Sequence, residues 1–222
     1  WLFKKTFKNL SNLTIISDKT TNLIREFDYH CSLLNLVKYF NITYDKIYMI
    51  DNYKNLNIKI NKKCNKIISS IKDNTYIINW KGNPKNMHEK SNRMMDLKNA
   101  IPLFMIDKIN WIVINKDITD GEKKILNKYN VKYYGNIIDK EMAFYDTISI
   151  LRKVKGVVST DTSIPHLSLS LGIKTYVLLT LGCEWRWTQD KTTNWYPDAI
   201  LLRQEKLSDW GEPINKLIKL IS

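Results

Sequence analysis

The chain has 222 residues, of which 44% are hydrophobic and 26% charged, so it is long enough for one large or two small domains with a buried core. This composition excludes a disordered chain. The sequence contains no run of about 18 apolar residues, so no membrane-spanning helix is predicted. The net charge of +13 is compatible with anionic partners. Its lysines are spread among Asn and Ile along the whole chain, as AT-rich coding produces, so the charge identifies no partner.

The spacing of the three cysteines indicates the redox state of the cellular compartment. Cys31, Cys64 and Cys183 show neither a CxxC pair nor a Cys/His ligand spacing, so we expect no zinc site and no disulfide framework. The N-terminus also lacks a charged stretch followed by an apolar one, which disfavours secretion. We therefore expect a cytoplasmic protein and, because the chain starts at Trp1 rather than Met, a fragment or processed piece.

The first 74 residues predict few elements. They are rich in Asn and Lys, with a strand at 13–16 and weak helices near 33–40 and 62–71. This stretch is too short for a complete Rossmann-like domain. We expect residues 1–74 to be the end of an N-terminal domain and a linker helix into the next one.

From Thr75 onward, apolar β-rich runs alternate with amphipathic stretches, which is typical of a parallel sheet with helices on both faces. Candidate strands span 76–80, 111–115, 131–134, 156–159 and 175–179, and candidate helices span 96–106, 120–129, 141–154, 163–171 and 209–221. Asp120 is expected to cap the second of these helices, and Gly172 to end the fourth. Residues 75–222 thus predict one complete doubly wound α/β domain, Rossmann-like in type.

The segment 157–172 is the most informative one. An apolar strand ends in Asp161, Thr162 and Ser163, and a helix begins at once. A helix start at the carboxyl edge of a parallel sheet offers unpaired backbone N–H groups and a partial positive charge, which suits a diphosphate. His166 is placed to donate to a phosphate oxygen. The alternative stays open on spacing alone: the three residues only cap the helix, and His166 is a packing residue.

A wider set of motifs resembles a known bacterial group. The motifs are Asp161-Thr-Ser-Ile-Pro-His-Leu167, the apolar run 174–180, Trp185-Arg-Trp187, Trp195-Tyr-Pro197 and the strand Leu201-Leu-Arg-Gln204. In this order they resemble the C-terminal catalytic region of tetratricopeptide-repeat-associated glycosyltransferases related to the heptosyltransferase group, glycosyltransferase family 9. Ile78–Lys85 with Arg93, and Phe144–Thr147, match two further elements, and Phe27–Leu34 resembles the end of the family's N-terminal domain, so the resemblance covers nearly the whole chain.

The resemblance implies a GT-B fold and a metal-independent, inverting transfer of a sugar. The donor is a nucleotide-diphosphate sugar, and the acceptor is a glycan, a lipid-linked sugar or a protein; no cofactor is implied. His166 and Lys85 correspond to catalytic residues, since a cation after Trp80 replaces a metal in neutralising the leaving diphosphate. The implied donor-binding residues are Asp161, Thr162, Ser163, Asn83, Arg93, Trp185 and Arg186. Trp187 and Trp195 are expected to anchor their loop instead.

One part of the family pattern is missing. The glycine-containing loop that supplies the family's catalytic base has no counterpart here, and neither Asp18 nor Asp28 is assigned that role. A catalytically inactive, glycosyltransferase-like binding domain therefore stays open as an alternative. A basic nucleic-acid-binding module is the other one, although no RRM, KH, helix-turn-helix or zinc signature supports it. Peripheral membrane contact is compatible with the charge.

Overall fold

A computed structural model of the chain describes residues 1–16, 27–47, 62–85 and 93–222. Short helices precede the sheet: α1 (Leu2–Thr6), η2 (Leu33–Asn35), α2 (Leu36–Tyr39), η3 (Tyr44–Lys46), η5 (Lys62–Cys64) and α3 (Asn65–Ser69). The expected weak helices near 33–40 and 62–71 are thereby confirmed. No helix in the described ranges is both long enough and apolar enough to cross a membrane.

One six-stranded sheet forms the body of the protein. Its strands are β1 (Thr75–Asn79), β2 (Asn110–Val113), β3 (Lys132–Tyr133), β4 (Gly156–Thr160), β5 (Thr175–Leu179) and β6 (Ile200–Arg203). They are all parallel and lie in the order β3-β2-β1-β4-β5-β6, with Ile77 opposite both Ile112 and Val157. This is the strand order of dinucleotide-binding Rossmann folds, in which ligands bind where the order reverses, here between β1 and β4.

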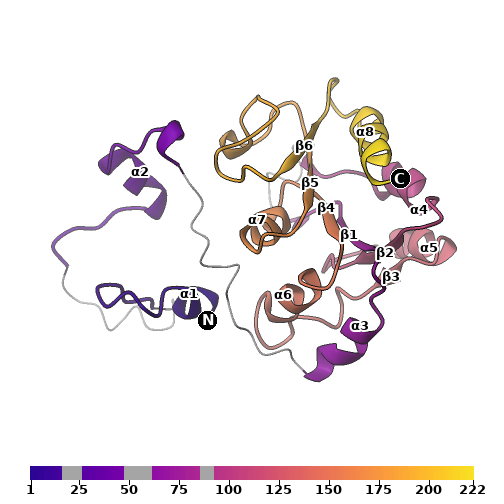
Figure 1. The fold of residues 1–222 in the computed structure, drawn as a ribbon, viewed down its shortest axis with the longest axis horizontal. Coiled ribbons are helices and arrows are strands. Elements are labelled where there is room, and N and C mark those ends of the chain that lie inside the picture. The colour runs from indigo at the N-terminus through magenta and orange to yellow at the C-terminus, as the bar shows by residue number, and fades with distance from the viewer. Residues whose placement is uncertain (17–26, 48–61, 86–92) are drawn as a thin grey trace.

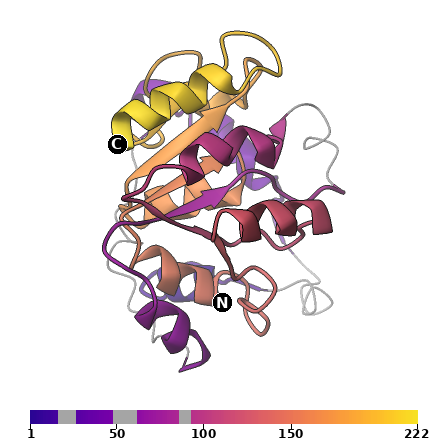
Figure 2. The same ribbon diagram turned by 90° about the vertical axis from the view of Figure 1, so that its right-hand side faces the viewer.

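Helices cover both faces of the sheet (Figure 1). The helices η7 (Leu97–Ala100), α4 (Ile101–Phe104), α5 (Asp120–Lys128) and α8 (Gly211–Ile221) cover one face, which is turned to the viewer in Figure 2. The helices α3, α6 (Tyr145–Leu151) and α7 (Ser163–Ser170) cover the other. Successive strand residues point to opposite faces, so Tyr76 and Ile78 pack on the first group and Ile77 on the second. The predicted doubly wound α/β architecture is therefore confirmed.

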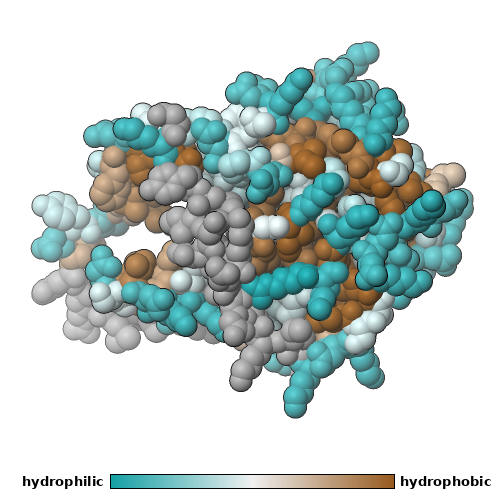
Figure 3. Space-filling model, viewed as in Figure 1, coloured by the Kyte–Doolittle hydropathy of each residue, from teal (hydrophilic) through white to brown (hydrophobic). Residues whose placement is uncertain are grey.

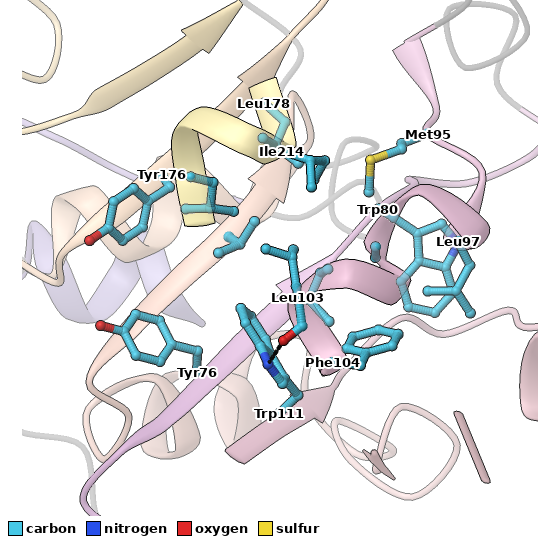
Figure 4. Packing of buried hydrophobic residues seen from close by; sticks show 14 of the residues in the cluster. Tyr76, Trp80, Met95, Leu97, Leu103, Phe104, Trp111, Tyr176, Leu178 and Ile214 are labelled. Atoms are coloured by element: carbon cyan, nitrogen blue, oxygen red, sulfur yellow. Dashed lines mark hydrogen bonds between the residues drawn. The ribbon is translucent and has the colours of Figure 1, made fainter. Parts of the chain in front are cut away.

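Aromatic side chains fill the first of these two layers (Figure 4). Trp80 and Trp111 are buried at 0% and 4% exposure, and Trp111 packs edge-on against Phe104 with ring centroids 6.2 Å apart. The indole Nε1 of Trp111 donates to the Leu103 carbonyl at 2.9 Å, so its polar atom is satisfied in the core. Truncating such a buried Trp to Ala typically costs about 3–5 kcal/mol.

The helix ends follow local rules, with one correction. The predicted cap at Asp120 is wrong: Thr119 is the N-cap of α5, and its side chain and that of Glu122 form a reciprocal capping box. Asp120 pairs with Lys123 at 2.8 Å instead. The prediction for Gly172 is confirmed, because this glycine follows the end of α7 with φ of 73°, a left-handed conformation that favours glycine.

Other boundaries differ from the sequence expectations. The strand expected at 13–16 is wrong: these residues lie in irregular structure, with Leu13 and Ile16 44% and 41% exposed. A short apolar run forms a strand only where a neighbouring strand supplies its hydrogen bonds. The helices expected at 96–106 and 141–154 are shorter, at 97–104 and 145–151.

The N-terminal residues contact the sheet domain in part. Trp1 packs edge-on against Tyr145 and donates from Nε1 to the Ala143 carbonyl at 2.8 Å. By contrast, Leu33 and Phe40 at the ends of η2 and α2 are 78% and 70% exposed, and brown apolar side chains are visible at this position in Figure 3.

Gly135 provides a direct test of packing beside the carboxyl end of β2. A Cβ at this position would lie 1.7 Å from the carbonyl oxygen of Asn115, far inside contact distance. Gly135→Ala is expected to lower the midpoint of thermal unfolding by several degrees or to prevent folding, because backbone must move. Gly121→Ala is the matched control, since its Cβ would meet only Thr119 Oγ1 at 3.8 Å. Equal midpoints for the two variants would contradict the close approach.

Candidate functional site

A cavity of about 370 Å³ opens at the carboxyl edge of the sheet, beside the segments that follow β1, β2 and β4. The loop after β1 contributes Lys81, Gly82 and Asn83 to its lining, and the start of α7 contributes Thr162 and Ser163. The cavity therefore lies where the strand order reverses, the usual ligand position in such sheets.

Two buried asparagines line this cavity, Asn79 at the end of β1 and Asn115 two residues beyond the end of β2. Asn79 donates from Nδ2 to Ser159 Oγ and to Thr162 Oγ1, both at 3.1 Å, and so joins β1 to the loop after β4. Asn115 donates from Nδ2 to the Lys81 carbonyl at 2.9 Å. Its Oδ1 is buried without a hydrogen-bond partner in the described part of the chain. Such an atom is an acceptor that a bound ligand can satisfy.

The start of α7 offers donors to the same cavity. Thr162 caps this eight-residue helix by accepting from the Ile164 N–H at 3.3 Å. Ser163, the first helical residue, is exposed and lines the cavity. The N–H groups at the start of a helix lack intrahelical partners and carry the positive end of its dipole. This geometry favours an anionic group.

Two lysines line the cavity, and each is paired with a carboxylate. Lys81 is 8% exposed and contacts both carboxylate oxygens of Glu122, at 2.7 and 2.8 Å. Burial raises the pKa of Glu122, but hydrogen bonds from Lys81, the Thr119 N–H and Trp80 outweigh it, so the pKa lies below its ordinary value.

Lys116 is the second lysine of the cavity. Its Nζ donates to the Ile138 carbonyl at 2.8 Å and lies 3.4 Å from Asp139 Oδ2. The same Asp139 carboxylate accepts the N–H groups of Asp146 and Thr147 and the Thr147 hydroxyl, and thus holds the first turn of α6. Thr147 also lines the cavity, so this motif of the sequence lies at the site.

Lys85, predicted from the sequence as a catalytic residue, lies in the turn beyond Asn83. Its backbone N–H donates to Asn83 Oδ1 at 3.0 Å, and its side chain is exposed. Lys85 is absent from the cavity lining in the described structure, whereas Lys81 and Lys116 belong to it. These two lysines and both asparagines were not among the site residues predicted from the sequence. All four lie at or just beyond the carboxyl end of a strand: Asn79 ends β1 and Lys81 follows two residues later, while Asn115 and Lys116 follow the end of β2 by two and three residues.

Asp161 and His166 form a second group on the other side of α7. Asp161 is buried, lies 3.5 Å from Arg93 Nε and accepts from that nitrogen at its backbone carbonyl. His166 Nε2 lies 3.9 Å from Asp161 Oδ1, and Nδ1 is 3.0 Å from the Tyr196 hydroxyl. The imidazole also stacks on Trp187 with ring centroids 4.8 Å apart. Three of the predicted site residues, Arg93, Asp161 and His166, thus lie together. They lie beside the cavity rather than in its lining.

His166 is neutral at physiological pH. Burial lowers its pKa to about 4; Asp161 acts in the opposite direction, and the charges of Arg186 and Arg93 lower it further. A neutral imidazole has one N–H donor and one acceptor nitrogen, so it hydrogen-bonds a ligand without adding charge.

The Trp185–Trp187 motif forms the short helix η8 (Trp185–Trp187) next to His166. Trp187 is fully buried against the end of the sheet, as the anchoring interpretation expects. Trp185 is 53% exposed, with the Arg186 guanidinium 5.2 Å from its ring and the Trp195 ring 5.6 Å away. Among the described residues, no group of three His, Cys, Asp or Glu side chains is arranged to hold a metal ion.

No protein-family model matches this chain, and no curated protein matches it. Among solved structures, the chain is similar to E. coli heptosyltransferase WaaC with ADP-2-deoxy-2-fluoro heptose, at 12% identity and a TM-score of 0.46 over 72% of this chain and 48% of that one. It is also similar to E. coli ADP-heptose lps heptosyltransferase II, at 10% identity and a TM-score of 0.48 over 75% and 53%. The chain spans about half the length of these heptosyltransferases.

The low pKa of His166 predicts a pH dependence of stability. The folded state binds a proton only near pH 4, whereas an unfolded histidine binds one near 6.5. Between these values the unfolded state holds more protons than the folded state, so acidification through this window removes about 3 kcal/mol of the free energy of unfolding. His166→Gln is expected to flatten this slope in urea titrations between pH 7 and 4. His30→Gln, at an exposed residue, should leave it unchanged; an unaltered slope in the His166 variant would contradict the burial of a neutral imidazole.

Proposed function

We propose that this chain is the donor-binding part of a glycosyltransferase and takes a nucleotide-diphosphate sugar in the cavity beside the ends of β1, β2 and β4. The observation that carries the proposal is the start of α7, where Ser163 lines a cavity at the reversal of the strand order and the positive end of the helix dipole lies beside it. The sequence motifs that resemble heptosyltransferase-related enzymes surround the same edge. They include the Trp-Lys-Gly-Asn-Pro segment 80–84 and the Asp161–His166 segment.

The proposed chemistry is a displacement at the anomeric carbon with inversion. An acceptor hydroxyl forms the new C–O bond while the bond to the diphosphate breaks, and the hydroxyl proton passes to a base that we do not assign to a residue of this chain. Negative charge develops on the leaving diphosphate. The helix start, Lys81 and Lys116 provide donors and positive charge for it, so the transfer needs no metal or other cofactor.

The finer expectations belong to the same proposal. We infer a glycan, a lipid-linked sugar or a protein as acceptor, and an association with tetratricopeptide repeats, in a cytoplasmic protein. His166 serves as a neutral hydrogen-bond donor beside the diphosphate. Lys85 acts from the rim of the cavity, and Asp161, Asn83, Arg93, Trp185 and Arg186 surround the donor.

Binding of a nucleoside diphosphate tests the proposal. At a ligand concentration 100-fold above Kd, binding adds about 2.7 kcal/mol to stability and raises the unfolding midpoint of a chain of this size by roughly 5–10 °C. We expect such a shift with at least one of ADP, UDP, GDP and CDP, and a smaller one with the matching monophosphate, because the second phosphate reaches the start of α7.

Ser163→Glu separates anion binding from folding. A carboxylate at the first helical position interacts favourably with the helix dipole, so the folded state is preserved, but it brings a negative charge into the cavity. This variant is expected to abolish the diphosphate-induced shift. Ser163→Gln has nearly the same size without the charge and should keep most of it. The proposal fails if the Glu variant responds like the wild type, or if no nucleoside diphosphate shifts the wild type.

A further inference from the structure

A chain of hydrogen bonds joins the N-terminal residues to η8, whose Trp187 stacks on His166. Tyr44, on η3, donates from its hydroxyl to Thr193 Oγ1 at 3.1 Å. Asn194 donates from its backbone N–H to the Tyr44 hydroxyl at 2.7 Å and from Nδ2 to the Tyr44 carbonyl at 3.1 Å. The contact therefore connects positions about 150 residues apart in the sequence through both side chain and backbone.

Thr193 continues this chain toward the site. It is 2% exposed, and its hydroxyl donates to the Arg186 carbonyl at 2.5 Å while accepting from the Trp195 N–H at 3.2 Å. Each hydroxyl proton thus has one acceptor: that of Tyr44 goes to Thr193, and that of Thr193 goes to Arg186. A buried hydroxyl with all its partners in place fixes the geometry of the backbone that it contacts.

Arg186 lies at the end of this hydrogen-bond chain opposite to Tyr44. Its Nε is 3.1 Å from Glu184 Oε2, and its guanidinium lies over the Trp185 ring. Burial lowers the pKa of the His166 imidazole, and Asp161 raises it. Arg186 is close enough for its charge to lower this pKa further, as does Arg93. The position of Arg186 therefore affects the electrostatic potential at His166.

We propose that Tyr44 and Thr193 are positioning residues, whose two hydroxyls hold Arg186 beside His166 when the segment around η3 is docked on the loop 185–195. The docked segment then sets the affinity of the site for an anionic ligand, because a guanidinium held at a fixed place binds an anion better than a mobile one. This second statement rests on the proposed function, whereas the positioning of Arg186 does not.

Titration of His166 by NMR tests the positioning without any ligand. Thr193→Val keeps the shape of the side chain and removes the hydroxyl, so Arg186 loses its fixed position and the pKa of His166 rises. We expect a rise of roughly half a unit, the change that moving one charge away by a few Å produces at an effective dielectric near 20. Thr193→Ser restores the hydroxyl and should restore the pKa.

Two further variants separate positioning from general loosening of the fold. Arg186→Gln removes the charge, and in that background Thr193→Val should cause no additional rise, because a double-mutant cycle isolates the route through Arg186. Tyr44→Phe should give part of the Thr193→Val effect. Tyr39→Phe, at a tyrosine that is 66% exposed on α2, is the matched control and should give none.

The outcomes distinguish this proposal from the proposed function. An unchanged pKa of His166 in Thr193→Val, or an equal rise in the Arg186→Gln background, overturns the positioning role. If the pKa changes as expected, ADP, UDP, GDP and CDP are titrated against wild type, Tyr44→Phe and Tyr39→Phe. A severalfold higher Kd for the Tyr44 variant alone supports the effect on affinity, and equal Kd values contradict it. Absence of binding to the wild type contradicts the proposed function and leaves the pKa result standing.

Discussion

Asn79 is a buried amide at the carboxyl end of the central strand β1, and its Nδ2 donates to Ser159 Oγ and Thr162 Oγ1. These two bonds span the point at which the strand order reverses, where parallel strands leave a crevice. They also fix the residue that caps α7, so the helix starts at a set position above the sheet. The cavity and the direction of its helix dipole both depend on this contact.

Around that contact, charge is arranged in pairs. Lys81 lies against Glu122, Lys116 against Asp139, and Arg93 against Asp161. Two of these carboxylates also hold another part of the fold: Glu122 closes the capping box of α5, and Asp139 binds the first turn of α6. The pairs of Lys81 with Glu122 and of Lys116 with Asp139 therefore hold the domain together and orient the two lysines that line the cavity. An incoming diphosphate would meet positive groups already held in position, a condition for effective electrostatic stabilisation.

Much of the sheet could be predicted because its strands are continuous apolar runs, buried on both faces, as in β1, β4 and β5. The helix start at Thr162–Ser163 could also be predicted, because a capping residue directly after an apolar strand is a local sequence feature. Lys81 and Lys116 were not, because their roles depend on Glu122 and on Asp139, partners that only the fold brings close. The strand predicted at 13–16 was wrong for the opposite reason. Its apolar pattern is a local feature, whereas a strand forms only with a partner strand elsewhere in the fold.

Backbone amide shifts in ¹⁵N NMR spectra, recorded while a nucleoside diphosphate is added, test the central claim most directly. The account predicts the largest changes at Gly82, Asn83, Ser163 and Ile164, together with the side-chain amides of Asn79 and Asn115, all at the cavity or its floor. Changes confined to the exposed lysines of α5, with the cavity amides unmoved, would contradict it and reduce the interaction to the net charge of the chain.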